Sequence, residues 1–365
     1  MLNFTSALYL GLYHPMQSLR PWKQFTTGTP AALAQPPIAS NVEKQLAALQ
    51  GLQRATLGPS TFHLFWDLFG ILVQKRITIY LDKGAYPIAK WGVERAGAAS
   101  VSVNAFRHHD ADLLRRQIYR TNTLGKRPVI VTDGFCPGCG KAAPLADYLT
   151  IIRQFGGYLL IDDTQALGIL GHHPAWYKPY GLGGGGSLRW HDIQDPHIVN
   201  VSSMAKGFGV PLAALSGSEK FVRRLEAASD TRVHSSPASI ADIHAAEHAL
   251  KINRPRGDLL RKRLAWNVAR FRNRLRDAGI VNQGGSFPVQ ALPIPEQIAE
   301  RIHKRLSQCG VATVLQLSCQ SQKPCISFVL NARHEADEID KAIKIFARVF
   351  YEIENDACMI ASRSM

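Results

Sequence analysis

The chain has 365 residues, of which 46% are hydrophobic and 19% charged, a composition typical of a globular protein with one large domain and a smaller one. No stretch approaches the roughly 18 consecutive apolar residues of a membrane span, and Met1–Tyr13 lacks the basic start and sustained apolar run of a signal peptide. The formal net charge of +15 favours anionic partners, but the basic residues are scattered, so we expect a cytoplasmic protein without a nucleic-acid or membrane partner.

Between residues 40 and 240, short apolar runs alternate with helical patterns. The expected helices span 42–52, 62–73, 88–96, 110–119 and 146–155, and the expected strands span 77–81, 99–104, 128–132, 158–161 and 198–202. This alternation is typical of an α/β domain with a mostly parallel sheet whose strands are buried on both faces.

The pattern changes after about residue 240. The sequence predicts a long helix over 240–277, then a strand at 288–292, a helix at 296–308, strands at 311–317 and 325–330, and a last helix at 335–353. We therefore expect an N-terminal segment over 1–40 that packs on the small domain, a large α/β domain over 41–240, and a small α+β domain over 241–365.

Three chemically active side chains fall at or just after expected strand ends: Asp133, Asp162 and Lys206. Because ligands of parallel sheets bind beyond the carboxyl ends of the strands, these two carboxylates and one amine are expected in one crevice. A lysine there can form a Schiff base with an aldehyde cofactor or shuttle protons. Pyridoxal phosphate (PLP) also needs an acidic partner for its ring nitrogen and donors for its phosphate, and Ser60 and Thr61 stand just before a helix.

Several motifs resemble those of one enzyme family, in order and at similar spacing. The run YLLIDDTQALGILG at 158–171 resembles the D-[DE]-x-H-x-x-G-x-x-G segment of the α-oxoamine synthases, the family of 8-amino-7-oxononanoate synthase, and SSMAKGFG at 202–209 resembles their lysine segment. Shorter matches are SALYLGL at 6–12, FRHHD at 106–110, TDG at 132–134 and APL at 143–145. The resemblance therefore covers nearly the whole chain.

The resemblance implies a PLP-dependent transferase of fold type I, with a mostly parallel seven-stranded sheet in the large domain and a smaller α+β C-terminal domain. It implies a biosynthetic acyltransferase in which PLP turns an amino substrate into a carbanion that condenses, with decarboxylation, with an acyl-CoA or acyl-carrier-protein thioester. It also implies a homodimer with a shared active site. Another PLP reaction on this scaffold, such as transamination or aldol cleavage, and a non-catalytic relative are the alternatives.

The family's site residues carry over by position. Lys206 would carry the cofactor, and Asp162 would pair with its ring nitrogen. The other expected cofactor contacts are the phosphate loop Ser60, Thr61 and Phe62, the phosphate-contacting hydroxyls of Ser203 and, toward the neighbouring subunit, Ser235, and the acidic Asp133 near the ring.

Four positions depart from the family pattern. Tyr86 replaces a histidine that stacks on the PLP ring and assists proton transfer; a tyrosine can still stack. Gln165 replaces a histidine that donates to the phenolic oxygen of PLP, which an amide can also do. Pro137 replaces a serine, and Ser327 replaces the arginine that binds the substrate carboxylate. Arg333 is a possible substitute for that arginine.

The only Cys-x-x-Cys pair is Cys136 and Cys139. A structural zinc site would need a second close pair, and the spacing of Cys319 and Cys325 is too wide to supply it. We therefore expect reduced thiols and no metal ligands, and we expect His108 and His109 to be structural or at the surface.

Overall fold

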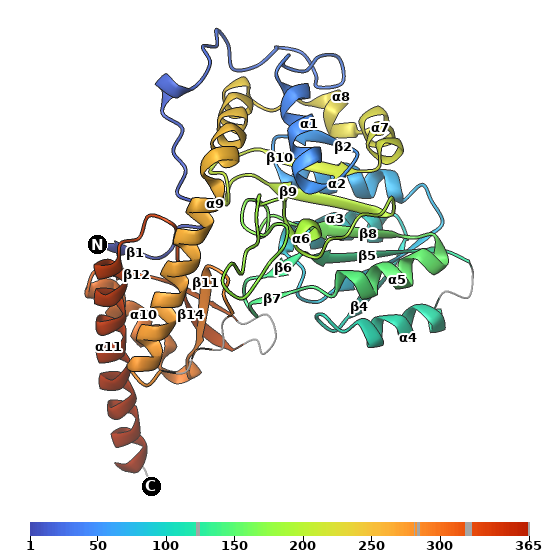
Figure 1. Cartoon of the computed structure of the whole chain (residues 1–365). Coiled ribbons are helices and arrows are strands. Elements are labelled where there is room, and N and C mark those ends of the chain that lie inside the picture. The colour runs from blue at the N-terminus through green and yellow to red at the C-terminus, as the bar shows by residue number, and fades with distance from the viewer. Residues whose placement is uncertain (122–124, 281, 283–284, 318–322, 364–365) are drawn as a thin grey trace.

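The computed structural model describes residues 1–121, 125–280, 282, 285–317 and 323–363, so Cys319 lies outside the described residues. Its centre is a seven-stranded sheet in the order β2-β10-β9-β8-β5-β3-β4 (Figure 1). The strands are β2 (Arg54–Gly58), β3 (Ile77–Asp82), β4 (Ser102–Phe106), β5 (Arg127–Asp133), β8 (Tyr158–Asp162), β9 (Ile198–Ser203) and β10 (Ala213–Gly217). In this sheet β10 pairs antiparallel with both neighbours, and the other described pairings are parallel.

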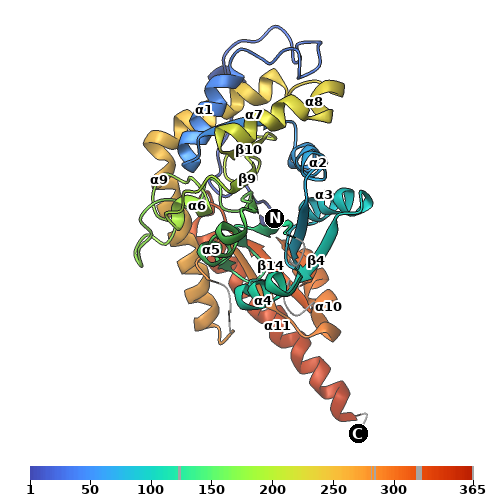
Figure 2. The same ribbon diagram turned by 90° about the vertical axis from the view of Figure 1, so that its right-hand side faces the viewer.

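Helices cover both faces of this sheet (Figure 2). One face carries α2 (Thr61–Leu72), α3 (Pro87–Ala98) and α7 (Glu219–Ala228), and the other carries α4 (Ala111–Thr121), α5 (Leu145–Phe155) and α6 (Ser187–Trp190). Successive residues of β5 alternate between the two cores: Val129 and Val131 pack toward α2 and α3, and Ile130 packs toward α5. A strand that is buried on both faces has a continuous run of apolar residues in its sequence, which is why these strands could be predicted.

A third core lies where the N- and C-terminal regions meet. It includes a small sheet in the order β11-β14-β13, the long helix α9 and three further helices (Figure 1). The elements are β11 (Val289–Pro293), β13 (Val314–Leu317), β14 (Pro324–Val329), α1 (Ala39–Gln50), α9 (Ile240–Asp277), α10 (Glu296–Gln308) and α11 (Ala336–Arg363). At the chain start, β1 (Leu2–Asn3) pairs in parallel with β12 (Val311–Ala312).

Shorter elements complete the fold. They are a 3₁₀ turn η1 (Met16–Ser18), the hairpin of β6 (Phe135–Cys136) and β7 (Lys141–Ala142), and α8 (Asp230–His234). No helix in the described part of the chain is both long and apolar enough to cross a membrane.

The expected elements are present, with corrections at a few boundaries. Eight of the described elements besides η1 were missed: β1, β2, β6, β7, β10, α6, α7 and α8. The expected strand at 99–104 begins later, at Ser102, because α3 continues to Ala98 and Ser100 turns the chain with a positive φ of 63°. The expected strand at 311–317 is divided between β12 and β13, which pair in different sheets.

Candidate active site

Three neighbouring parallel strands end in a carboxylate. β3 ends at Asp82, β5 at Asp133 and β8 at Asp162, and Asp133 and Asp162 are directly paired across the two strands. All three side chains are buried. The sequence expectation that Asp133 and Asp162 share one sheet edge is therefore confirmed, and Asp82 is a third acid at that edge that the sequence reasoning missed.

Burial makes both paired acids hard to ionise. Burial raises the pKa of Asp133 well above its usual range, and the charge of Asp162 raises it further, while the Tyr86 N–H, 3.0 Å from Asp133 Oδ1, opposes the shift. Burial also raises the pKa of Asp162, but hydrogen bonds from Thr164 and the charge of Lys206 favour its ionised form. Burial thus raises the pKa of both acids, and Lys206 and Thr164 oppose the shift only at Asp162, so Asp162 is the more readily ionised of the two.

Lys206 lies in the turn just after β9 and completes this group. Burial lowers the pKa of its amine, and the charges of Asp162 and Asp133 oppose that shift. A lysine poised in this way is more readily deprotonated than a surface lysine, and only the deprotonated amine is a nucleophile.

Thr164 ties the Asp162 segment to the lysine segment. Its backbone N–H donates to Asp162 Oδ1 at 3.0 Å, and its hydroxyl oxygen accepts a hydrogen bond from the Ser203 N–H at 3.1 Å. The Ser203 hydroxyl in turn accepts from the Ala205 N–H at 3.2 Å, next to Lys206. Sequence reasoning missed Thr164 although it lies inside the recognised D-D-T-Q run, because a threonine two residues after an acid carries no specific signal.

Tyr86 stands over the lysine. It precedes α3, its ring is 47% exposed, and Lys206 Nζ lies 5.5 Å from the ring centroid. The hydrogen bond from its backbone to Asp133 fixes the segment in place. Its aromatic face is therefore positioned to cover a flat ligand bound at Lys206.

The N-terminus of α2 supplies a candidate phosphate site. Ser60 precedes the helix and makes no side-chain capping bond, and its hydroxyl lies 2.9 Å from His63 Nδ1. The first N–H groups of an α-helix have no partner within the helix and attract anions. Thr61 is buried while Phe62 is 42% exposed, so the Phe62 contribution to this site is its backbone.

Gln165 is held by a residue from the far end of the sequence. The Tyr9 hydroxyl donates to Gln165 Oε1 at 2.6 Å. Burial raises the pKa of Tyr9, so this hydroxyl keeps its proton and acts as a donor. Because the carbonyl end of the amide is engaged, its NH₂ end is the one directed to other acceptors.

Ser235 lies at the C-terminal end of a short helix. It ends α8, donates from its hydroxyl to the Thr231 carbonyl at 2.5 Å, and lines a small pocket together with Pro59 and His63 beside the start of α2.

Ser327 and Arg333 do not form a carboxylate-binding site with the other residues that the structure describes. Ser327 is buried in β14, where its hydroxyl accepts from Gln316 Nε2 at 2.9 Å. The Arg333 guanidinium lies 3.3 Å from the Tyr13 ring centroid and donates to the Gly11 carbonyl.

Known proteins match this chain along almost its full length. The model for the family "aminotransferase class I and II", whose members depend on PLP, matches residues 2–346. The fold is similar to serine palmitoyltransferase from Sphingomonas wittichii (TM-score 0.83, 17% identity) and from S. paucimobilis in a form with bound PLP and myriocin (TM-score 0.84, 14% identity). Both alignments cover 96% of this chain and 88% of the other.

It is also similar to 8-amino-7-oxononanoate synthase from Francisella tularensis, with a TM-score of 0.75, 18% identity, and coverage of 96% of this chain and 98% of that one. At these identities the likeness establishes the fold, which is PLP fold type I with a mostly parallel seven-stranded sheet, as the sequence predicted.

Proposed function

The chain belongs to the aminotransferase class I and II family, and from this premise we propose that it is a PLP-dependent acyl-condensing enzyme of the α-oxoamine synthase type. The observation that carries this proposal is the convergence of the buried amine of Lys206 with the carboxylate of Asp162 at the edge of the sheet. The similar folds of serine palmitoyltransferase and 8-amino-7-oxononanoate synthase support the acyl-condensing reaction in particular.

The donor set fits PLP. Lys206 would hold the aldehyde carbon, Asp162 the ring nitrogen, and the N-terminus of α2 with Ser203 the phosphate. When bound, PLP supplies the electron sink that stabilises a carbanion on the amino substrate. Gln165 would donate to the phenolic oxygen, and Tyr86 would cover the exposed ring face.

The protein residues would hold and move the protons. Asp162 would pair with the ring nitrogen, and Thr164 and Lys206 favour its ionised form against the effect of burial. Lys206, whose pKa burial lowers, would hold the cofactor through its neutral amine and, when released, would carry a proton between substrate atoms. Asp133, whose pKa burial raises, accepts a hydrogen bond from the Tyr86 N–H and would position that ring.

A pocket beside α9 supports a thioester co-substrate. It has a volume of about 680 Å³, a size ordinary for ligand sites, and its wall is mainly apolar, with Tyr180, Leu259 and Trp266. Lys178, Lys262 and Arg272 also line it, which suits the phosphates of CoA or an acidic carrier protein. Two of its lining residues are joined by a hydrogen bond, since the Tyr180 hydroxyl donates to the Ser286 carbonyl at 2.6 Å.

Ser327 favours a second candidate, a different PLP reaction or an amino substrate without a carboxylate. Its hydroxyl is already bonded to Gln316, and a serine cannot form the bidentate contact of an arginine. Assays of CO₂ and CoA release against amino-group transfer, over a panel of amino acids and amines, separate the two reactions.

The first test concerns PLP on Lys206. Purified protein should show the visible absorption of a PLP–lysine Schiff base. Borohydride reduction should then attach PLP irreversibly to the peptide that contains Lys206, where the PLP serves as a label. Lys206→Ala should lose both signals, and the surface variant Lys220→Ala should keep them. A label on another lysine, or full absorption in Lys206→Ala, would refute the proposed role.

The second test concerns the thioester pocket. Arg272→Glu should raise KM for an acyl-CoA roughly two- to fivefold, since an exposed ion pair is worth up to about 1 kcal/mol, and leave KM for the amino substrate unchanged. An equal rise in both KM values would argue against a thioester pocket at this position.

A further inference from the structure

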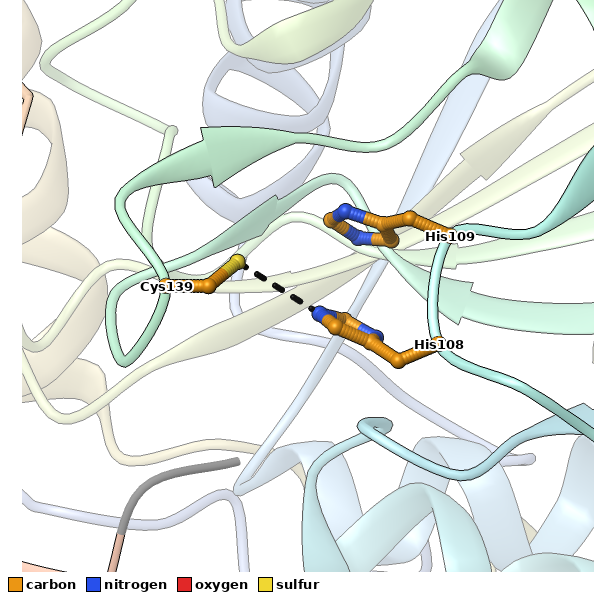
Figure 3. Close-up of side chains that lie close together, drawn as sticks. All are labelled: His108, His109 and Cys139. Carbon is orange, nitrogen blue, oxygen red and sulfur yellow. Dashed lines mark hydrogen bonds between the residues drawn. The ribbon is translucent and has the colours of Figure 1, made fainter. Parts of the chain in front are cut away.

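The turn that carries the Cys-x-x-Cys pair lies against two adjacent histidines. Cys136 ends β6 and Cys139 lies in the turn before β7, while His108 and His109 follow β4 (Figure 3). One ligand atom each from His108, His109 and Cys139 lies within 4.8 Å of the others. The sequence offered no second pair for Cys136 and Cys139, because the histidines lie about thirty residues away and only the sheet brings the two loops together.

The spacing within this cluster is that of a metal site. Cys139 Sγ lies 3.5 Å from His108 Nε2. A tetrahedral zinc ion, with Zn–N bonds of about 2.0 Å and Zn–S bonds of about 2.3 Å, holds its nitrogen and sulfur ligands about 3.5 Å apart. The Cys136 side chain also hydrogen-bonds to His108, so both thiols of the pair border the same imidazole.

Asp82 holds His108 in the orientation of a metal ligand. His108 Nδ1 lies 2.7 Å from Asp82 Oδ1, and both side chains are buried. Metal-binding histidines commonly donate their other ring N–H to a carboxylate, which fixes the ring and its tautomer. Asp82 Oδ1 also accepts from the Gly84 N–H at 2.8 Å, and Oδ2 from the Thr132 hydroxyl at 3.2 Å, so the carboxylate itself is held.

His109 contributes the second ring. Its Nε2 is buried and has no hydrogen-bond partner among the residues that the structure describes. The rings of His108 and His109 lie almost one above the other, with centroids 3.7 Å apart, and both extend toward the cysteine turn (Figure 3). A buried ring nitrogen without a partner is costly, and a metal ion in the cluster would satisfy it.

Gly84 makes room for this arrangement. A Cβ at Gly84 would lie only 2.1 Å from His108 Nδ1, so a larger residue there would push the imidazole away from Asp82. Three segments therefore meet at one point: the loop after β3, the loop after β4, and the turn between β6 and β7.

We propose that this cluster is a structural zinc site held by His108 Nε2, His109 and Cys139, with the neighbouring Cys136 thiol, which hydrogen-bonds to His108, as its fourth ligand. Two imidazoles and two thiolates favour zinc over calcium or magnesium, which prefer oxygen. Binding releases the thiol protons and links the loop of the histidines after β4 to the turn of the cysteines between β6 and β7. None of the four ligands has a role in the proposed reaction, so zinc binding can be measured independently of that reaction.

The test measures metal on the full-length protein. After incubation with Zn²⁺ and removal of excess, elemental analysis should find about one zinc per chain in the native protein and almost none in Cys139→Ser or His109→Ala, because a structural site needs its four ligands. Cys309→Ser and His173→Ala, which change a thiol and an imidazole outside the cluster, should retain the zinc. Circular dichroism of each variant should confirm that it is folded.

Two further measurements distinguish a specific zinc site from nonspecific zinc binding. Asp82→Asn should keep the stoichiometry but weaken zinc affinity roughly 10- to 100-fold, as expected for loss of a ligand-orienting carboxylate. With Co²⁺ as the probe, the thiolate-to-metal absorption band should fall in Cys136→Ser and in Cys139→Ser. Zinc equally retained in the ligand variants, or a Cys136–Cys139 disulfide in native protein that binds no zinc, would overturn the proposal.

Discussion

At the scale of single residues, the site depends on side chains that are oriented by partners far away in the sequence. Gln165 is oriented by Tyr9, and Asp162 is linked to the lysine segment through Thr164. Neither link carries a sequence signal, since a tyrosine near the start of the chain and a threonine after two acids are common. The sequence could therefore predict which residues gather at the sheet edge, but not what holds them there.

Tyr9→Phe tests the positioning of Gln165. The variant loses the 2.6 Å hydrogen bond but keeps the ring, which packs edge-on against Phe287. We expect kcat to fall roughly 5- to 10-fold, because a typical hydrogen bond contributes about 1 kcal/mol, while PLP remains bound. The position of the PLP absorption band should also shift, because the donor to the phenolic oxygen changes. An unchanged band and kcat would contradict the positioning role.

Asp163, which follows the β8 carboxylate, should make stability depend on pH. Burial raises its pKa to about 7, although Ser187 stabilises the charged form. Between about pH 4 and pH 7 the folded chain therefore keeps a proton that the unfolded chain releases, so stability falls as pH rises, by up to about 1.4 kcal/mol per pH unit.

Denaturation midpoints of the native protein and Asp163→Asn at several pH values measure this effect. The difference between the two proteins should change across that range, because other titrating groups are common to both. Parallel curves would show that Asp163 does not titrate there.

At the scale of elements, the turn that carries Lys206 is set by close contact between two loops. A Cβ at Gly207 would lie 2.3 Å from the Leu167 carbonyl oxygen and 3.0 Å from Gly168 Cα, both of them backbone atoms that cannot move aside. The glycines recognised in the sequence at 168 and 207 thus allow the lysine turn to pack on the loop after Asp162.

Gly207→Ala should separate these loops. We expect a loss of about 1–3 kcal/mol of stability from overpacking, and weaker PLP absorption because Lys206 is displaced. Gly97→Ala in α3 is the matched control: its nearest atom would be Val103 Cγ2 at 4.0 Å, so it should stabilise the helix by up to about 1 kcal/mol. Thermal melts and PLP titrations give both results, and equal behaviour of the two variants would refute the argument.

The sequence predicted buried parallel strands well and missed elements of other kinds. Val129–Val131 lie between two helical layers, so their apolar run is unbroken. In contrast β10, with the sequence Ala-Ala-Leu-Ser-Gly, contains small residues of weak strand propensity and is fixed by its two antiparallel neighbours. The sequence predicted β12 and β13 as one strand, because the hydrophobicity pattern does not change where the chain passes from one sheet to the other.

At the scale of the whole molecule, an exposed aromatic group favours the homodimer that the family resemblance implies. Phe62, Trp66 and Trp91 on α2 and α3 are 40–51% exposed, with ring centroids 6.1 and 6.5 Å from Phe62. Exposed apolar clusters of this kind commonly mark interfaces. Phe62 is at the start of α2, so a second subunit packed on this group would lie close to the phosphate loop.

The double variant Trp66→Glu, Trp91→Glu should convert the dimer to a monomer in light scattering after gel filtration. A charge buried in an interface without a partner is strongly unfavourable. Trp176→Glu, a side chain that is 93% exposed on another loop, should remain dimeric. A monomeric native protein, or a dimer that persists in the double variant, would exclude this interface.

The pairing of β1 with β12 also has a consequence for how the protein is made. Leu2 and Asn3 pair with Val311 and Ala312. The first strand therefore cannot form its pairing until more than 300 residues have been translated. At about 5–20 residues per second this takes roughly 15–60 s on the ribosome. Tyr9 follows that strand and orients Gln165, so a nascent or truncated chain would lack this contact. The catalytic centre would thus mature only when synthesis is nearly complete.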